Sequence, residues 1–152
     1  MYFAKKAAMA NNGRFVLTDK ATNRTFYGTY DPKADKFDVN GFEVLTGKNK
    51  NSDIDPKVSL DQMEQLASQG KNIDPYKVTP VGFYPLTPQA NIYGAPGLNI
   101  GNSGTAYHIT YQGPDDMTRA KRYGNKNKAD NYTTYGCVNC QKPSIEHLTQ
   151  FV

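Results

Sequence analysis

Two cysteines and two histidines are the side chains of this sequence best suited to covalent chemistry. Cys137 and Cys140 lie close together, with His108 before them and His147 after them. A thiol becomes a nucleophile when it is deprotonated, and histidine commonly accepts its proton. These residues therefore suggest a cysteine nucleophile with a histidine base, beside the plainer alternative of a buried thiol and a packed imidazole.

The backbone around Cys137 suits a nucleophile. Gly136 allows the main chain to approach a substrate closely. Pro143 favours the first turn of a helix a few residues later, and backbone N–H groups at a helix start favour the thiolate of a nearby cysteine. We expect the N–H groups of Tyr135, Gly136 and Cys137 to form an oxyanion hole, the set of donors that stabilises the negative oxygen of a tetrahedral intermediate.

The elements that position these residues are predicted to be mainly strands. The β-prone runs cover residues 14–18, 25–30, 78–86, 92–97 and 106–111. The dipeptide Asn40-Gly41 separates two further runs, 36–39 and 42–45. It predicts a type I′ hairpin turn, because both central positions of that turn need positive φ.

Two helices accompany the strands. Ser59 begins a capping-box pattern that predicts a helix ending at Gly70, and Pro143 predicts a second helix after Cys137. Many short strands with few helices predict a mainly β fold. The expected architecture is a barrel or sandwich with one or two inserted helices and a helix after the cysteine.

The length and composition fit one folded domain over residues 1–152. A chain of 152 residues can bury a stable core without metal or disulfide bonds. Its eleven tyrosines add apolar area to that core, which excludes a disordered chain. Residues 48–77 and 112–132 are polar stretches that we expect to be inserted or lid segments.

Charge and hydropathy exclude two kinds of partner. The net charge of +4 is mild, and the basic residues at 119–128 lie among glycine and asparagine, which is typical of a loop rather than of a nucleic-acid recognition helix. No run of about 18 apolar residues occurs, so we expect no membrane-spanning helix. The first residues do not resemble a signal peptide, so export would need a leader outside this sequence or a dedicated secretion route.

Three motifs in chain order resemble the catalytic domain of the L,D-transpeptidase family. They are Thr79-Pro80-Val81-Gly82-Phe83, His108-Ile109-Thr110 and Thr134-Tyr135-Gly136-Cys137-Val138-Asn139. The run ending in Thr46-Gly47-Lys48 is similar to a strand of that family that ends in Ser/Thr-Gly-Lys. The resemblance extends from about residue 14 to residue 148, and Tyr135 stands where the family has histidine.

The resemblance implies an L,D-transpeptidase-like β fold and acyl transfer on peptidoglycan without cofactor or metal. Cys137 would attack the third residue of a tetrapeptide stem, meso-diaminopimelate or lysine, and expel D-Ala. His108 would take up the thiol proton and return it to the leaving amine. The thioester would then pass to an amine, giving a 3–3 cross-link or an exchanged D-amino acid, or to water.

The same resemblance implies the surroundings of the site. Thr134, Asn139, Tyr107 and Thr110 are expected to bind substrate. The substrate class places the protein outside the cytoplasm, in the periplasm or cell wall. Its partners would be peptidoglycan stem peptides, with an immunity or secretion partner if the protein is delivered to attack another cell.

Three alternatives use the same residues differently. Cys137-Val138-Asn139-Cys140 is a Cys-x-x-Cys sequence, which elsewhere is a thiol–disulfide redox motif. The two cysteines with His108 and His147 also make up a Cys₂His₂ zinc-ligand set. The third alternative is a cell-wall-binding domain without catalysis, because exposed tyrosine and lysine suit glycans and anionic polymers.

Overall fold

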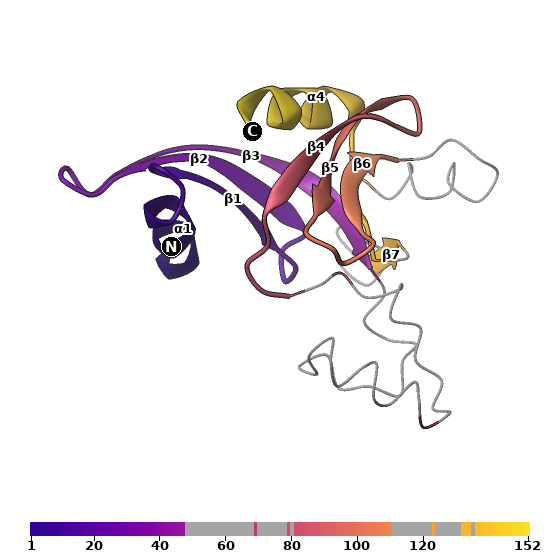
Figure 1. The fold of residues 1–152 in the computed structure, drawn as a ribbon, viewed down its shortest axis with the longest axis horizontal. Coiled ribbons are helices and arrows are strands. Elements are labelled where there is room, and N and C mark those ends of the chain that lie inside the picture. The colour runs from indigo at the N-terminus through magenta and orange to yellow at the C-terminus, as the bar shows by residue number, and fades with distance from the viewer. Residues whose placement is uncertain (48–68, 70–78, 80, 111–122, 124–131, 135) are drawn as a thin grey trace. The chain divides into compact units, whose positions relative to one another are not determined.

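The computed structural model describes residues 1–47, 69, 79, 81–110, 123, 132–134 and 136–152 (Figure 1). Within these residues the protein is mainly β, as predicted, with two helices beside the strands. The chain divides into two compact units, Met1–Val44 and Leu45–Val152, and each is described by itself. No helix in the described ranges is long and apolar enough to cross a bilayer.

The first unit is a helix on a three-stranded antiparallel meander. Its elements are α1 (Tyr2–Met9), β1 (Arg14–Asp19), β2 (Arg24–Asp31) and most of β3 (Lys36–Gly47). β1 pairs with β2 and β2 with β3, so each strand lies beside the one that precedes it in the chain. The strands β1 and β2 confirm the predicted runs 14–18 and 25–30.

Small and aromatic side chains form the core of the first unit. Ala4 and Ala8 lie on the buried face of α1 and pack with Phe15 of β1 and Tyr30 of β2. The ring of Phe37 in β3 lies 5.9 Å from that of Phe15 and 4.6 Å from that of Tyr30, between centroids. Helix α1 itself was not anticipated from the sequence.

The hairpin predicted at Asn40-Gly41 is wrong, because β3 runs through this dipeptide without turning. In the β2–β3 register Asn40 pairs with Tyr27, and Gly41 pairs with Phe26. A Cβ atom on Gly41 would lie 3.0 Å from a carbon of the Phe26 ring. Glycine therefore serves close packing at this position and not a turn.

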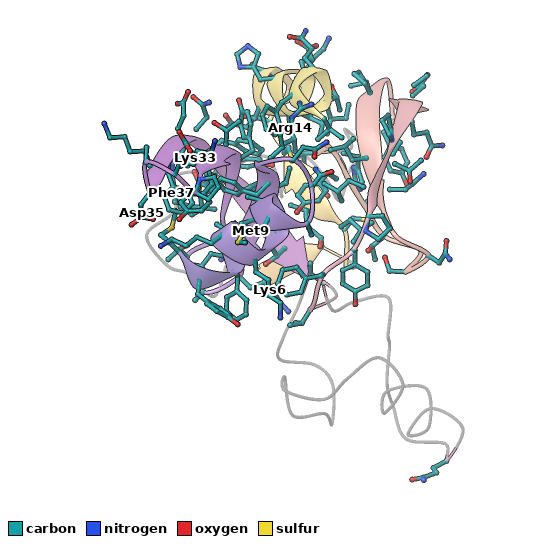
Figure 2. The ribbon with its side chains drawn as sticks, turned by 60° about the vertical axis from the view of Figure 1, so that its left-hand side comes forward. Lys6, Met9, Arg14, Lys33, Asp35 and Phe37 are labelled. Carbon is teal, nitrogen blue, oxygen red and sulfur yellow. The ribbon has the colours of Figure 1, made fainter. Side chains whose placement is uncertain are left out.

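The chain turns earlier, between Asp31 and Lys36. The Asp31 carboxylate accepts hydrogen bonds from the backbone N–H groups of Lys33 and Ala34 at 2.9 and 3.3 Å. This is local aspartate turn chemistry, which competed successfully with the Asn-Gly signal. Figure 2 shows the labelled side chains of Lys33, Asp35 and Phe37 at this hairpin.

The second unit contains strands whose order in the sheet differs from their order in the chain. Its elements are the end of β3, β4 (Leu86–Ile92), β5 (Ala95–Ile100), β6 (Ala106–Ile109), β7 (Tyr132–Thr134), β8 (Val138–Cys140) and α4 (Lys142–Phe151). The order is β3-β8-β6-β5-β4, with β7 also pairing with β3. The β6–β8 and β3–β7 pairs are parallel, and a parallel pair joins segments that are distant in sequence.

Two predicted runs of the second unit shift in the structure. The run 78–86 is wrong for the described residues 81–85, and β4 begins at Leu86. Pro85 has no backbone N–H to donate to a strand ladder, which explains the late start. The run 92–97 is interrupted by a turn at Tyr93-Gly94, whereas β6 confirms the first four residues of the run 106–111.

Helix α4 confirms the helix predicted after Cys137. Pro143 stands in its first turn, and Ile145 and Leu148 form its buried face. The helix packs on β5 and β6. The helix predicted between Ser59 and Gly70 and the segments 48–77 and 112–132 lie outside the described residues, apart from Gln69, Tyr123 and Tyr132.

Candidate functional site

The parallel pair of β6 and β8 brings the predicted base and nucleophile into one neighbourhood. In its register Tyr107 pairs with Val138, and His108 pairs with Asn139. Cys137 immediately precedes β8, two positions before the partner of His108. For a backbone that is extended from Cys137 to Asn139, a strand spacing of about 4.8 Å and a rise of about 3.3 Å per residue give roughly 8 Å between the Cα atoms of His108 and Cys137. A thiol and an imidazole on the same face can meet across that span.

The alternation of side chains along a strand decides which residues share that face. Asn139 lies opposite His108, so strand alternation assigns these two to one face. Cys137 lies just before β8 and two positions from Asn139, and extending the alternation by that one residue gives it the same face. Tyr107 and Cys140 belong to the other face. The predicted substrate residue Tyr107 is therefore placed away from His108, and only 6% of it is exposed.

The imidazole of His108 is buried and held by a backbone group. Only 5% of the residue is exposed, and its Nδ1 lies 2.5 Å from the carbonyl oxygen of Ile109. A carbonyl oxygen can only accept a hydrogen bond, so Nδ1 must carry the proton and donate it. The neutral ring then has its lone pair on Nε2, which is the atom able to accept a proton from a thiol.

Thr134 holds the backbone of the two residues that precede β8, Gly136 and Cys137. The hydroxyl of Thr134, which is fully buried, donates to the carbonyl of Cys137 at 2.5 Å. The same hydroxyl oxygen accepts a hydrogen bond from the N–H of Gly136 at 3.3 Å. Gly136 has φ +103°, a conformation that L side chains rarely adopt. The Thr134 hydroxyl therefore stabilises the backbone of Gly136 and Cys137.

The bond to Thr134 also bears on the predicted oxyanion hole. The N–H of Gly136 is directed at the Thr134 hydroxyl in this structure, so it would have to exchange partners to bind an oxyanion. Tyr135, the first of the three expected donors, lies outside the described residues. The N–H of Cys137 itself remains a predicted donor.

The two cysteines occupy different environments. Cys137 is partly exposed and Cys140 is fully buried, and the structure has no disulfide between them. Burial raises the pKa of the Cys140 thiol far above its usual value, so this thiol stays protonated. Of the two thiols, that of Cys137 is therefore the one accessible to a reaction partner from solvent.

The remaining predicted residues are buried polar groups or surface positions. Thr110 is 8% exposed, and its hydroxyl lies 2.9 Å from that of Tyr123. His147 is exposed on α4. Among the residues that the structure describes, no three histidine, cysteine or acidic side chains come together as a metal-binding group, and the zinc alternative gains no support.

Asn139 is an unusual polar residue beside His108. Its side chain has no exposed surface, and neither its Oδ1 nor its Nδ2 has a hydrogen-bond partner in the described structure. A buried polar group left unsatisfied costs about 1–3 kcal/mol. The unsatisfied amide therefore belongs to the residue that pairs with the predicted base, His108, across the β6–β8 strand pair.

Tyr93 is a site residue that the sequence analysis missed. It lies in the turn between β4 and β5, and its ring centroid is 5.0 Å from that of His108, with the two planes at 64°. The signal was present in Tyr93-Gly94, a two-residue loop between strand-forming residues, but tyrosine is not a usual residue for such a turn. The sequence could not identify the Ile109 carbonyl as the acceptor that orients His108, because this hydrogen bond depends on the rotamer of the histidine.

Two further motif residues are joined in the second unit. The N–H of Gly47, at the end of β3, donates to the hydroxyl of Thr79 at 2.8 Å, and Thr79 is 4% exposed. This bond links the Thr-Gly-Lys and Thr-Pro motifs, which are separated by a long stretch of chain.

Comparison of the chain with family models, with curated proteins and with solved structures gives no match.

Proposed function

We propose that this protein is a cysteine-dependent L,D-transpeptidase that acts on the tetrapeptide stems of peptidoglycan outside the cytoplasm. The observation that carries the proposal is the β6–β8 register, which puts Cys137 two positions from the strand partner of His108. The order of the motifs and the bond between Gly47 and Thr79 support the same assignment. The proposal includes the L,D-transpeptidase-like arrangement of the strands that the resemblance implies.

The first half of the reaction forms a thioester. Nε2 of His108 accepts the thiol proton of Cys137, and the sulfur attacks the carbonyl carbon of the bond between the third residue and D-Ala. The C–N bond then breaks, and the imidazolium gives its proton to the departing amine of D-Ala. Because Nδ1 is held by the Ile109 carbonyl, the same ring nitrogen serves both proton transfers.

The second half regenerates the thiol. An acceptor amine or a water molecule loses a proton to His108 as it attacks the thioester, and the C–S bond breaks to return the proton to sulfur. An amine acceptor gives a cross-link or an exchanged D-amino acid, and water gives a shortened stem. Backbone N–H groups near Cys137 stabilise the oxyanion in both halves, a contribution of typically about 3–4 kcal/mol per donor.

The test is D-Ala release from a purified disaccharide-tetrapeptide, with the products identified by mass. We expect release by the wild-type protein and none by Cys137→Ala. Cys140→Ala is the matched control, because it removes the thiol assigned to the opposite face and should retain release per folded molecule. Release by Cys137→Ala at the wild-type rate, or no reaction by the wild-type protein, would overturn the proposal; stem or glycan binding without turnover would indicate a cell-wall-binding domain.

A further inference from the structure

The turn between β4 and β5 holds an aromatic residue in a conformation that it seldom adopts. Ile92 pairs with Ala95, so Tyr93 and Gly94 are the two central residues of the hairpin loop. Their φ angles are +56° and +94°, as a type I′ turn requires, and Asn91 accepts the N–H of Gly94 at 2.8 Å. Glycine and asparagine suit these positions, whereas positive φ strains a bulky residue such as tyrosine.

The other positive-φ side chains show how exceptional this choice is. Among the described residues, the non-glycine positions with positive φ are Asn12, Asn23, Asp35 and Tyr93. Asparagine and aspartate tolerate the left-handed region, because their short polar groups can bond locally. Tyr93 therefore keeps a strained backbone that a common substitution would relieve, and such strain often marks a functional position.

The ring of Tyr93 covers the predicted base. It contacts the His108 imidazole with its plane at 64° to it and the centroids 5.0 Å apart, a favourable edge-to-face geometry. Tyr93 is 59% exposed, whereas His108 is 5% exposed. One part of the tyrosine thus contacts the imidazole while the rest faces solvent.

We infer that Tyr93 is a positioning residue, whose ring holds the plane of the His108 imidazole and shields it from water. The Ile109 carbonyl fixes Nδ1, and the tyrosine ring limits rotation and tilt of the imidazole. The catalytic meaning of this role rests on the proposed function, because an oriented base accelerates proton transfer. The shielding itself is a property of the folded protein and can be measured without a substrate.

The shielding test compares the two histidines of the same chain. Diethyl pyrocarbonate acylates accessible neutral imidazoles, and mass spectrometry of peptides gives the rate at His108 relative to His147, which is exposed on α4. Tyr93→Asn removes the ring and suits the left-handed turn, while Tyr93→Phe keeps the ring. We expect Tyr93→Asn to raise the relative rate at His108 about tenfold and Tyr93→Phe to leave it unchanged. An unchanged rate in Tyr93→Asn would overturn the inference.

Strain and activity supply two further readouts. Tyr93→Asn should raise the melting temperature by about 2–4 °C, because it relieves the backbone strain. Tyr93→Asn should lower kcat for D-Ala release by about tenfold with little change in KM. Tyr93→Phe, which keeps the ring, should have the kcat of the wild-type protein. Wild-type kcat in Tyr93→Asn would contradict positioning. A faster acylation of His108 in a protein that releases no D-Ala would refute the proposed reaction and leave the shielding role intact.

Should Tyr93→Asn fail to fold, Tyr93→Gly gives the same comparison, because glycine also adopts positive φ without strain. The two variants remove the ring by different residues, so agreement between them assigns the effect to the ring. Equal protection of His108 in Tyr93→Gly and in the wild-type protein would again overturn the inference.

Discussion

The two units of the chain differ in where their unfavourable features lie. In Met1–Val44 the strands pair in chain order, and the positive-φ side chains are Asn12, Asn23 and Asp35, which suit that conformation. In Leu45–Val152 the strands β4, β5 and β6 pair in chain order, whereas β3, β7 and β8 pair out of order, and the described non-glycine residue with positive φ is Tyr93.

Among the described residues, the bulky side chain held at positive φ lies in the second unit. Tyr93 carries a backbone cost of about 1–3 kcal/mol, and the unsatisfied amide of Asn139 carries a cost of similar size. Both features lie next to His108, one by ring contact and one by strand pairing. Costs that converge on one imidazole are expected where a protein is organised for chemistry.

The largest expected effect is the loss of the base. His108→Gln should lower kcat for D-Ala release by about 10²- to 10⁴-fold, because general base catalysis contributes that range. The melting temperature should change little or rise, since glutamine keeps polar groups near the Ile109 carbonyl. Steady-state kinetics and thermal unfolding of the same preparation check both. Retention of wild-type kcat would remove His108 from the mechanism.

Two substitutions compare an unsatisfied buried polar group of the second unit with a hydrogen-bonded one of the first unit. Asn139→Leu replaces an unsatisfied amide by an apolar group of similar size and should increase the free energy of unfolding by about 1–3 kcal/mol while lowering D-Ala release. Thr25→Val in the first unit should decrease it by about 1 kcal/mol, because the Thr25 hydroxyl lies 2.7 Å from that of Thr18. Denaturant unfolding measures both free energies, and a stability loss in Asn139→Leu would show that the Asn139 amide makes favourable interactions in the folded protein.

The smallest effect is expected at the exposed charge cluster of the first unit. The Tyr30 hydroxyl donates a hydrogen bond to Oδ1 of Asp35 at 2.6 Å, and Nζ of Lys5 lies 3.1 Å from the same oxygen. Both groups hold the pKa of the Asp35 carboxyl below its usual value. The stability that this carboxylate contributes is present above its unfolded pKa of 3.8 and is lost as pH falls through the lower folded value.

Asp35→Asn keeps a residue that tolerates positive φ and removes the charge. We expect the melting temperature at neutral pH to fall by no more than about 4 °C, because the ion pair is exposed. The difference from the wild-type protein should vanish at low pH, where the carboxylate is protonated. D-Ala release should not change. A difference that persists in acid would show that the charge is not its cause.

Local signals predicted much of the fold. The strands β1, β2 and part of β6 and the helix α4 follow from β-prone runs and from Pro143, because each depends on neighbours in sequence. Asn40-Gly41 misled for a physical reason: the glycine is needed to pack against Phe26, and the Asp31 carboxylate supplies the turn. Packing across strands is not visible in a dipeptide.

The site was predictable in its residue types but not in its arrangement. Cys137 and His108 could be singled out by their chemistry. The hydrogen bond of His108 to the Ile109 carbonyl, the hydrogen bond of Thr134 to Cys137 and the ring contact of Tyr93 with His108 depend on tertiary geometry. A parallel strand pair such as β6 and β8 leaves no local signal, because its partners are joined by a long connection.

We propose that the pairing of β6 and β8 lets His108 act as the base for Cys137. The most direct test of this proposal is the rate at which iodoacetamide alkylates Cys137 at neutral pH, in the wild-type protein and in His108→Gln, with the buried Cys140 as an internal control. We expect alkylation of Cys137 to slow by about tenfold or more without the imidazole, because the thiolate is the reactive form, while Cys140 stays unmodified in both proteins. Equal rates at Cys137 in the two proteins would contradict the proposal.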